Sequence, residues 1–208
     1  DADFDGHPNS HRDANSDHNV YRVFPKFDQV ALASPYSLVG TPTVFKFTVT
    51  AMGLADSKLL FDNLAAGSGS IKFEVISSGQ WVQANASTQF SIYDANDGTL
   101  LDSNTLTQDA RTSTDASLTF DFTERDVEIG GGQSKTFRIQ LDNPSANYAK
   151  TSESGRAADY FQVILRDNEA SLINWVDNST GVAADDGDNA SVRKTLRQLE
   201  IVGPTFQR

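Results

Sequence analysis

The sequence predicts an all-β protein: an antiparallel β-sandwich, Ig-like or jelly-roll-like, with an acidic N-terminal extension. Three observations predict this class. Short runs of residues alternate between apolar and polar side chains, as strands with one buried face do. Turn-forming Gly, Asn, Asp and Ser residues separate these runs. The 13 Phe residues provide the large side chains that a core between two sheets needs.

The predicted strands begin near residue 20. In TVFKFTVTA, the side chains of Phe45, Phe47 and Val49 share one face, and Lys46 and Thr48 share the other. The other long runs follow the same rule and cover residues 71–77, 89–93, 117–123, 135–141 and 159–167. Shorter runs cover residues 20–24, 29–33, 58–61, 99–102 and 172–176. Residues 191–202 also fit helical spacing, but we favour a final strand around Leu199 and Ile201.

Composition limits the classes of function. The chain has 28 Asp and Glu residues against 17 Lys and Arg, a net charge of −11. This excess argues against nucleic acid as a partner, because proteins bind its phosphates with cations, and against an anionic membrane surface. The absence of Cys excludes a disulfide framework, a thiolate zinc site and a cysteine nucleophile. No apolar run approaches the roughly 18 residues of a membrane span, so we expect none in this chain.

Residues 1–19 form a separate zone, and residues 20–208 form the β-sandwich module. The zone is rich in Asp, Asn, His and Ser, and Phe4 is its only large apolar residue. Such a stretch cannot bury enough apolar surface to fold alone, so we expect an acidic linker or tail that calcium could order. Because the chain begins with Asp rather than Met, we expect a processed protein or a piece of a longer one.

Alternating carboxylates in this zone predict a calcium site. Asp1, Asp3 and Asp5 have the spacing of a calcium loop, a Gly follows them, and Asn9 could add an oxygen. The EF-hand motif would need a Glu at loop position 12, where this chain has Arg12. A solvated acidic linker is therefore the alternative.

Two further oxygen-rich turns are candidate calcium sites. One contains Asp94 and Asn96, and the other contains Asp185, Asp186 and Asp188. The alternative for the first turn is an ordinary hairpin connection with Asn-Asp-Gly chemistry. Calcium is the cofactor that we expect.

The sequence has no motif that predicts catalysis. It has no G-x-S-x-G pattern, and His7, His11 and His18 all precede the β-rich region, where a base for a Ser would be needed. A carboxylate pair of the glycosidase type stays open, because the separation of carboxylates is not visible in a sequence. We therefore expect a protein that is not an enzyme.

Trp81 and Trp175 are the candidate ligand-binding residues. Both adjoin turn-like segments, where binding residues are often found, and an indole can stack on a sugar ring. The alternative is that one or both belong to the core of the sandwich.

Several segments, taken in order, resemble a known module. VYRVFPKFDQVALASP and VFKFTVTA are similar to its entry, and IKFEVISSG and FSIYDANDGTLL to its next strands. GGGQSKTFRIQLDN is similar to a late strand, and INWVDNS with VRKTLRQLEIVG to its closing segment. The chain thus resembles, over roughly residues 20–203, the β-sandwich module of large secreted surface-layer-like proteins of candidate-phylum bacteria. The acidic closing loop departs from that pattern.

The resemblance implies an extracellular or cell-surface location, and it provides no catalytic residues to carry over to this chain. We expect a non-enzymatic structural or assembly module of a bacterial cell-surface layer or extracellular filament. Its partners would be copies of itself, in a lattice or fibre. Contacts would run through edge strands, such as VYRVF or LEIVG, and through calcium-bridged acidic loops. The alternative is a carbohydrate-binding or adhesin module, with cell-surface glycans as partners.

Overall fold

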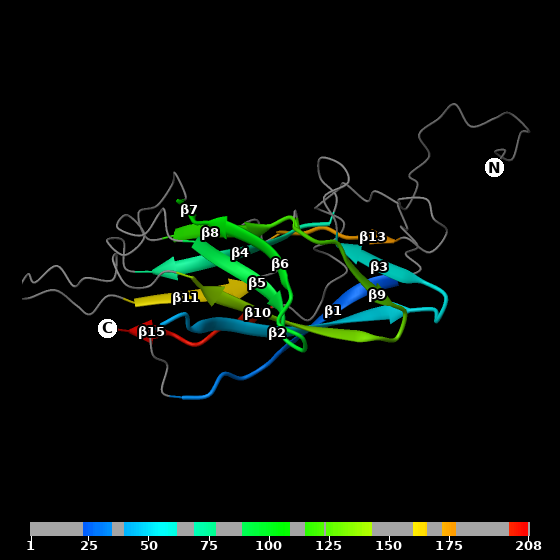
Figure 1. The fold of residues 1–208 in the computed structure, drawn as a ribbon, viewed down its shortest axis with the longest axis horizontal. Coiled ribbons are helices and arrows are strands. Elements are labelled where there is room, and N and C mark those ends of the chain that lie inside the picture. The colour runs from blue at the N-terminus through cyan, green and yellow to red at the C-terminus, as the bar shows by residue number, and fades with distance from the viewer. Residues whose placement is uncertain are drawn as a thin grey trace, which may run out of the picture.

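The computed structural model is all-β, and its antiparallel sheets pack together as a β-sandwich (Figure 1), which confirms the predicted fold class. It describes residues 23–34, 40–61, 69–77, 89–108, 115–122, 124–142, 160–165, 172–177 and 200–207. These residues form 15 strands and no helix. Accordingly, this part of the chain has no helix that is long and apolar enough to cross a membrane.

The first sheet has five strands in the order β1-β2-β10-β5-β6, and all neighbours are antiparallel. Its strands are β1 (Val23–Gln29), β2 (Thr43–Gly53), β10 (Ser134–Leu141), β5 (Gln89–Asp94) and β6 (Leu100–Thr105). The long central strands β2 and β10 follow the alternation that the sequence predicts. β1 and β6 form the two edges of this sheet.

The second sheet has the order β14-β11-β4-β8-β7. Its strands are β14 (Ile201–Val202), β11 (Tyr160–Leu165), β4 (Ile71–Ser77), β8 (Asp115–Phe120) and β7 (Thr107–Gln108). In addition, β12 (Leu172–Ile173) pairs with β4, and β15 (Phe206–Gln207) pairs with β11. A small third sheet, β13 (Val176–Asp177), β3 (Lys58–Phe61) and β9 (Val127–Gly130), lies at one end of the molecule (Figure 1).

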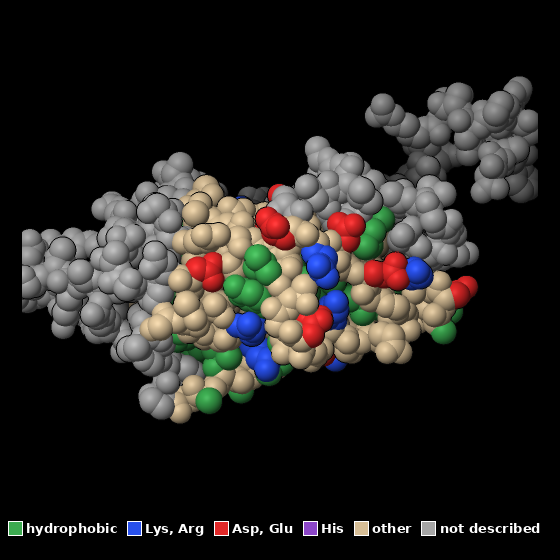
Figure 2. Space-filling view, in the orientation of Figure 1, with side chains coloured by type: hydrophobic (Ala, Val, Ile, Leu, Met, Phe, Trp, Pro, Cys, Tyr) green, Lys and Arg blue, Asp and Glu red, His purple; other side chains and the backbone are tan. Residues whose placement is uncertain are grey.

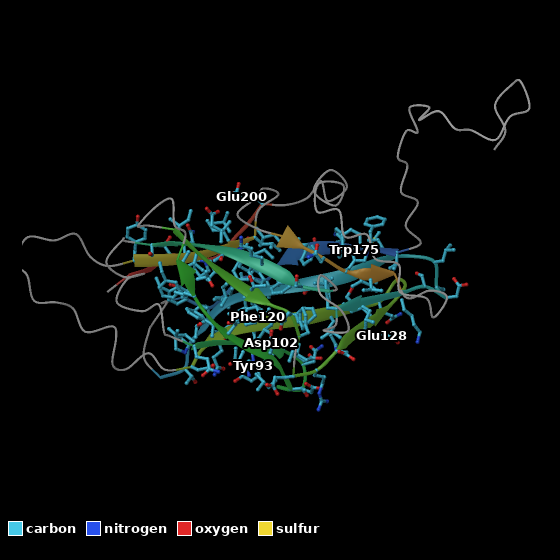
Figure 3. All side chains as sticks on the ribbon, turned by 90° about the horizontal axis from the view of Figure 1, so that it is seen from above. Tyr93, Asp102, Phe120, Glu128, Trp175 and Glu200 are labelled. Carbon is cyan, nitrogen blue, oxygen red and sulfur yellow. The ribbon has the colours of Figure 1, made fainter. Side chains whose placement is uncertain are left out.

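Phenylalanine rings form the centre of the core. The ring of Phe47 lies 5.2 Å from that of Phe137 on the neighbouring strand and 5.6 Å from that of Phe73 in the second sheet. Phe45 also contacts Phe73 at 5.6 Å, edge to face. Seen from above, Phe120 lies between the layers, whereas Tyr93 lies outside them on one side (Figure 3). Such aromatic pairs add geometric preference to the hydrophobic stabilisation.

Strand β1 differs from the prediction of separate runs at residues 20–24 and 29–33, because it continues through Pro25. The N–H of Val30 donates to the carbonyl of Lys46 at 3.0 Å, and hydrogen-bonded positions alternate along an antiparallel pair. Pro25 therefore occupies a position whose missing N–H would face away from β2. An edge strand accepts proline there without the loss of a ladder bond.

Three strands, β7, β9 and β15, are not in the prediction, because two to four residues are too short to show a period of two. In the predicted run of residues 71–77, the alternation places Glu74 on the solvent face, but the structure buries it to 8% exposure beside Ile164. The final strand is present at Ile201–Val202. The zone of residues 1–19 and its boundary lie outside the described residues and stay predictions.

Candidate assembly surfaces

One side of the sandwich is closed by a run of residues that passes from one sheet to the other. Strand β6 is the edge of the first sheet, and β7, two residues later, pairs with β8 in the second. Leu106 lies between them and is 5% exposed. Because strands that change sheets form the corners of a sandwich, this run makes the corner here.

The carboxylate of Asp102 bridges the two sheets at this corner. Its Oδ2 accepts hydrogen bonds from the backbone N–H groups of Asp121, at 2.8 Å, and Phe122, at 3.1 Å, which follow β8. Its Oδ1 accepts the N–H of Ser103 at 2.7 Å. Asp102 is 1% exposed, so its interactions are shielded from water. Phe122 has a φ of 58°, uncommon for a residue other than glycine, and Asp102 helps to hold it.

Asn104, two residues along β6, repeats this arrangement. Its Oδ1 accepts the N–H of Thr105 at 2.8 Å, and its Nδ2 donates to the carbonyl of Thr119 on β8 at 2.8 Å. The register gives these bonds a further role. The N–H of Asp142 bonds to the carbonyl of Gln89. The backbone N–H and C=O groups of odd-numbered residues of β5 therefore point toward β10, and those of even-numbered residues point toward β6.

By the same alternation, the N–H groups of Ser103 and Thr105 point away from β5, toward the open edge. The side chains of Asp102 and Asn104 cover both of these donors. Strand β6 therefore offers no free N–H at these two positions to a strand from another molecule.

The opposite edge strand, β1, is bonded to the rest of the fold at two positions. The indole Nε1 of Trp175 donates to the carbonyl of Val23 at 3.2 Å, and Nε2 of Gln29 donates to the carbonyl of Val202 at 2.5 Å. Pro25 lies between these two contacts and has no N–H to offer. The described part of the predicted donor VYRVF, Val23 and Phe24, pairs with β2 of its own chain.

The C-terminal strand lies along β11 in two pieces. Val202 and Ile201 pair with Ile164 and Leu165, and Phe206 pairs with Phe161. Ile201 and Phe206 are 4% and 2% exposed, respectively. The ring of Phe206 stacks on that of Phe161 with centroids 5.1 Å apart. The described part of the second predicted donor, LEIVG, thus also pairs within its own chain.

Gly203 joins the two pieces where the backbone of the C-terminal strand lies close to Phe45 and Val163. Its N–H donates to the carbonyl of Val163 at 2.9 Å, and its carbonyl accepts from Nε2 of Gln162 at 2.7 Å. A Cβ atom at this position would lie 2.7 Å from Cδ2 of Phe45 and 2.8 Å from the carbonyl oxygen of Val163. Only glycine fits here without displacement of a neighbour.

The outer face of the five-stranded sheet carries paired hydroxyl groups. The hydroxyl oxygens of Thr48 and Thr136 lie 2.9 Å apart, and those of Ser91 and Ser103 lie 2.6 Å apart. Positive and negative side chains are interspersed among the described residues of the visible face (Figure 2). This face therefore shows no large patch of a single sign.

Tyr93 and Arg138 lie at the middle of this outer face. The guanidinium carbon of Arg138 is 4.3 Å from the centroid of the Tyr93 ring, a cation–π contact. On the other side, Arg138 is opposite Lys46, and like charges opposite one another are unfavourable. The stack on Tyr93 is therefore a favourable contact that offsets part of this repulsion.

The surroundings of Asp142 and Asp97 shift the pKa of these two carboxyl groups in opposite directions. Burial raises the pKa of Asp142 above its ordinary 3.8, although hydrogen bonds from Ser91 and Gln140 oppose the shift. The hydroxyl of Ser91 donates to Oδ2 of Asp142. Hydrogen bonds from the backbone and side chain of Thr99 lower the pKa of the exposed Asp97.

Trp175 is not a sugar platform. It is 2% exposed and packs in the core, where its indole N–H donates to the carbonyl of Val23 on β1. Figure 3 shows it at the end of the molecule that holds the small third sheet. The prediction that Trp175 binds a ligand by stacking is wrong, because neither face of its ring is open. Trp81 lies outside the described residues.

Asp94 and Asn96 make the contacts of a hairpin turn. Oδ1 of Asp94 accepts the N–H of Asn96 at 2.9 Å, and its Oδ2 pairs with Nζ of Lys135 at 3.1 Å. The N–H of Gly98 closes the turn on the carbonyl of Asp94 at 3.0 Å, with a φ of 76° at Gly98. The buried carboxylate of Asp94 already has a cationic partner, so these contacts favour the hairpin alternative over a calcium site.

Within the described ranges, no three His, Asp or Glu side chains gather as a metal-binding group. The other predicted ligands lie outside those ranges, and calcium there stays a prediction. They are Asp1, Asp3, Asp5, Asn9, Asp185, Asp186 and Asp188.

Sequence reasoning missed Asp102, Asn104 and Gly203. The only signal for the first two is a pair of polar residues two apart in a short strand, and their targets on β8 are distant in sequence. Comparisons with protein-family models, curated proteins and solved structures found no match for this chain. The functional interpretation therefore depends on the geometry of these surfaces and on the sequence.

Proposed function

We propose that this chain is a non-enzymatic structural module of a bacterial cell-surface layer or extracellular filament, which assembles with copies of itself. One observation carries the proposal: side-chain hydrogen bonds tie both edge strands of the first sheet to other segments of the same chain. Asp102 and Asn104 do so at β6, and Trp175 and Gln29 do so at β1. The location rests on the resemblance to secreted surface-layer-like modules.

These side-chain hydrogen bonds suit a protein that carries mechanical load. The bonds of Asp102, Asn104 and Gln29 join the edge of one sheet to the other, so the sheets cannot slide apart without breaking them. The bonds of Asp102 are buried, and a satisfied buried polar network makes a structure rigid. The apolar core between the sheets adds a hydrophobic contribution that depends on the same packing.

Calcium is the second part of the proposal. With a net charge of −11, copies of the chain repel one another, and a divalent cation between acidic loops would reduce that repulsion. Carboxylate and amide oxygens are the ligands that Ca²⁺ prefers. The loop with Asp185, Asp186 and Asp188, together with the N-terminal acidic zone, would supply them.

Light scattering and thermal melting test this proposal, each in millimolar calcium, in magnesium and in excess chelator. We expect calcium to raise the melting temperature and to drive large assemblies, and magnesium to do so less because it keeps its water. A triple variant with Asp185→Asn, Asp186→Asn and Asp188→Asn should lose the calcium effect.

A matched control changes the net charge equally at three exposed acids elsewhere: Asp56→Asn, Glu124→Gln and Asp126→Asn. It should keep the calcium response. A protein that stays monomeric at every concentration, with and without calcium, would contradict the assembly proposal. An equal loss in both triple variants would show that net charge alone, and not a site, governs assembly.

A carbohydrate-binding module is the second candidate, and Tyr93 is the observation that favours it. Its ring lies on the outer face of a sheet, with Arg138 stacked on it and the hydroxyl group of Ser103 nearby on the adjacent strand. Titration with a saccharide panel tests this candidate. Tyr93→Ala should weaken binding about tenfold, whereas Tyr160→Ala, an exposed tyrosine on the other sheet, should not. A chain that binds none of the saccharides removes the candidate.

A further inference from the structure

We propose that the C-terminal strand, residues 200–207, joins the copies. In an assembly it leaves the groove beside β11 of its own chain and fills the same groove of a neighbouring copy. The inference rests on the proposed function, because it names the contact through which copies associate.

The groove beside β11 needs an occupant. Ile201 and Phe206 are almost fully buried in it, and Phe206 covers the ring of Phe161. If the strand left and nothing replaced it, these apolar side chains would meet water, which is unfavourable. An identical strand from a second copy restores every contact, so the exchange itself changes little in contact energy.

The groove also selects its occupant. Nε2 of Gln162 and the carbonyl of Val163 bond to the two sides of Gly203, and Nε2 of Gln29 bonds to the carbonyl of Val202. These three bonds specify the register of the strand. The missing side chain at Gly203 lets the backbone approach Phe45, which excludes strands that have a bulkier residue there.

The chain before this strand is long enough for an exchange. Residues 178–199 connect β13 to β14, and a stretch of about twenty residues spans up to about 70 Å when extended. A long connection also weakens the preference for the chain's own groove, because effective concentration falls with its length. In a crowded layer, a neighbour's groove is present at a comparable concentration. At the described edges, side chains already bond two N–H groups of β6 and the Val23 carbonyl of β1, and Pro25 has no N–H, so the C-terminal strand is the better donor.

Disulfide formation between chains tests the exchange, because the natural chain has no Cys. Ile164 and Val202 face each other on β11 and β14. Since the adjacent pair, Val163 and Gly203, is hydrogen-bonded, this pair is not, and its Cα atoms should lie about 4.5 Å apart. That separation suits a disulfide.

The experiment mixes two single variants of the full chain, Ile164→Cys and Val202→Cys, of which one carries a mass label. Neither can form this disulfide within its own chain. Under assembly conditions, we expect oxidation to link the two variants on non-reducing gels, in proportion to the assembly seen by light scattering. The control mixes Ile164→Cys with Leu54→Cys, which is 61% exposed in the turn after β2, and should link at least tenfold less.

The outcomes separate this inference from the proposed function. Assembly without cross-chain links above the control overturns the exchange and leaves the assembly proposal standing. Failure to assemble under every condition overturns both. Melting scans of the reduced variants show whether each one folds.

A second measurement needs no variant of the chain. A synthetic peptide of residues 199–208, added in excess, should occupy the groove and inhibit assembly of the natural protein. The same peptide with Gly203→Val should not inhibit, because its side chain meets Phe45. Equal effects of the two peptides would overturn the exchange.

Discussion

The backbone N–H of Phe122 donates to Oδ2 of Asp102 at 3.1 Å, and this bond joins the segment after β8 in one sheet to β6 in the other. The two residues are twenty positions apart and share a side of the sandwich where, among the described residues, β6 and β8 do not pair as neighbouring strands. The buried carboxylate of Asp102 links the sheets there, because it accepts the N–H groups of Asp121 and Phe122 as well as that of its neighbour Ser103. The same residue covers an edge that would otherwise be open to another strand.

Asp102→Ala should destabilise the fold by about 3 kcal/mol, because it leaves buried N–H groups of Asp121 and Phe122 without an acceptor. For a chain of this size, that is a fall in melting temperature of about 10 °C. Calorimetry or a denaturant titration measures it. Asp56→Ala, at an exposed turn aspartate, is the control and should change little. Similar losses for the two variants would show that Asp102 does not bridge the sheets.

Asn104→Asp should cost about 1 kcal/mol, although the two side chains have the same shape. The carboxylate still accepts the N–H of Thr105, but it cannot donate to the carbonyl of Thr119 and places two acceptors against each other. Chemical denaturation gives the change in unfolding free energy. If Asn104→Asp is as stable as the natural chain, the bond to Thr119 contributes nothing.

Gly203→Ala should destabilise the protein by about 2 kcal/mol, because its Cβ would collide with the Phe45 ring and the carbonyl of Val163. Hydrogen exchange at β11 should increase as the C-terminal strand separates from it. Gly130→Ala is the matched control, since its nearest neighbour is Cγ of Gln133 at 3.6 Å. Equal protection of β11 in both variants would count against the close approach at Gly203.

Asp142 should make the fold less stable as pH rises. Burial raises its pKa in the folded state above the ordinary 3.8, so the folded state holds a proton that the unfolded state releases. Its contribution is therefore most favourable below pH 3.8 and is lost as pH rises through the raised pKa. Relative to the natural protein, Asp142→Asn should gain stability across that window. Unfolding free energies measured as a function of pH give this difference.

Asp97 provides the control of opposite sign. Hydrogen bonds from Thr99 lower its pKa, so its contribution is present above pH 3.8 and is lost as pH falls through the lowered pKa. Asp97→Asn should therefore lose stability at neutral pH relative to acid pH. Difference curves of the same sign for the two variants would contradict this assignment.

The sequence predicts most strands because each long strand has one buried and one solvated face. Phe45, Phe47 and Phe137 are buried where the alternation places them. Pro25 interrupts the sequence pattern, but strand β1 continues through it. A proline is tolerated there because its missing N–H would point away from β2, and only the pairing of the strands shows this. Glu74 fits the alternation but is buried, because cover from other parts of the fold is not visible in a local pattern.

The candidate assembly surfaces are less predictable than the strands. The hydrogen bonds of Asp102 and Asn104 reach β8, and Trp175 reaches Val23 from far along the chain. Nothing in the neighbouring residues of the sequence distinguishes them from ordinary polar or turn residues. The prediction for Trp175 is wrong for this reason: a residue next to a turn in sequence lies in the core in space.

By itself, the sequence determined the all-β class, the strand periodicity and the large acidic excess, because these properties depend on composition and on neighbours along the chain. Only the tertiary structure decided which backbone groups at the sheet edges have side-chain partners, why residue 203 is glycine and which strand lies beside β11. These features depend on distances between segments that are far apart in sequence, such as Gly203 and Phe45. A pattern among neighbouring residues does not predict such distances, because the packing of the whole chain sets them.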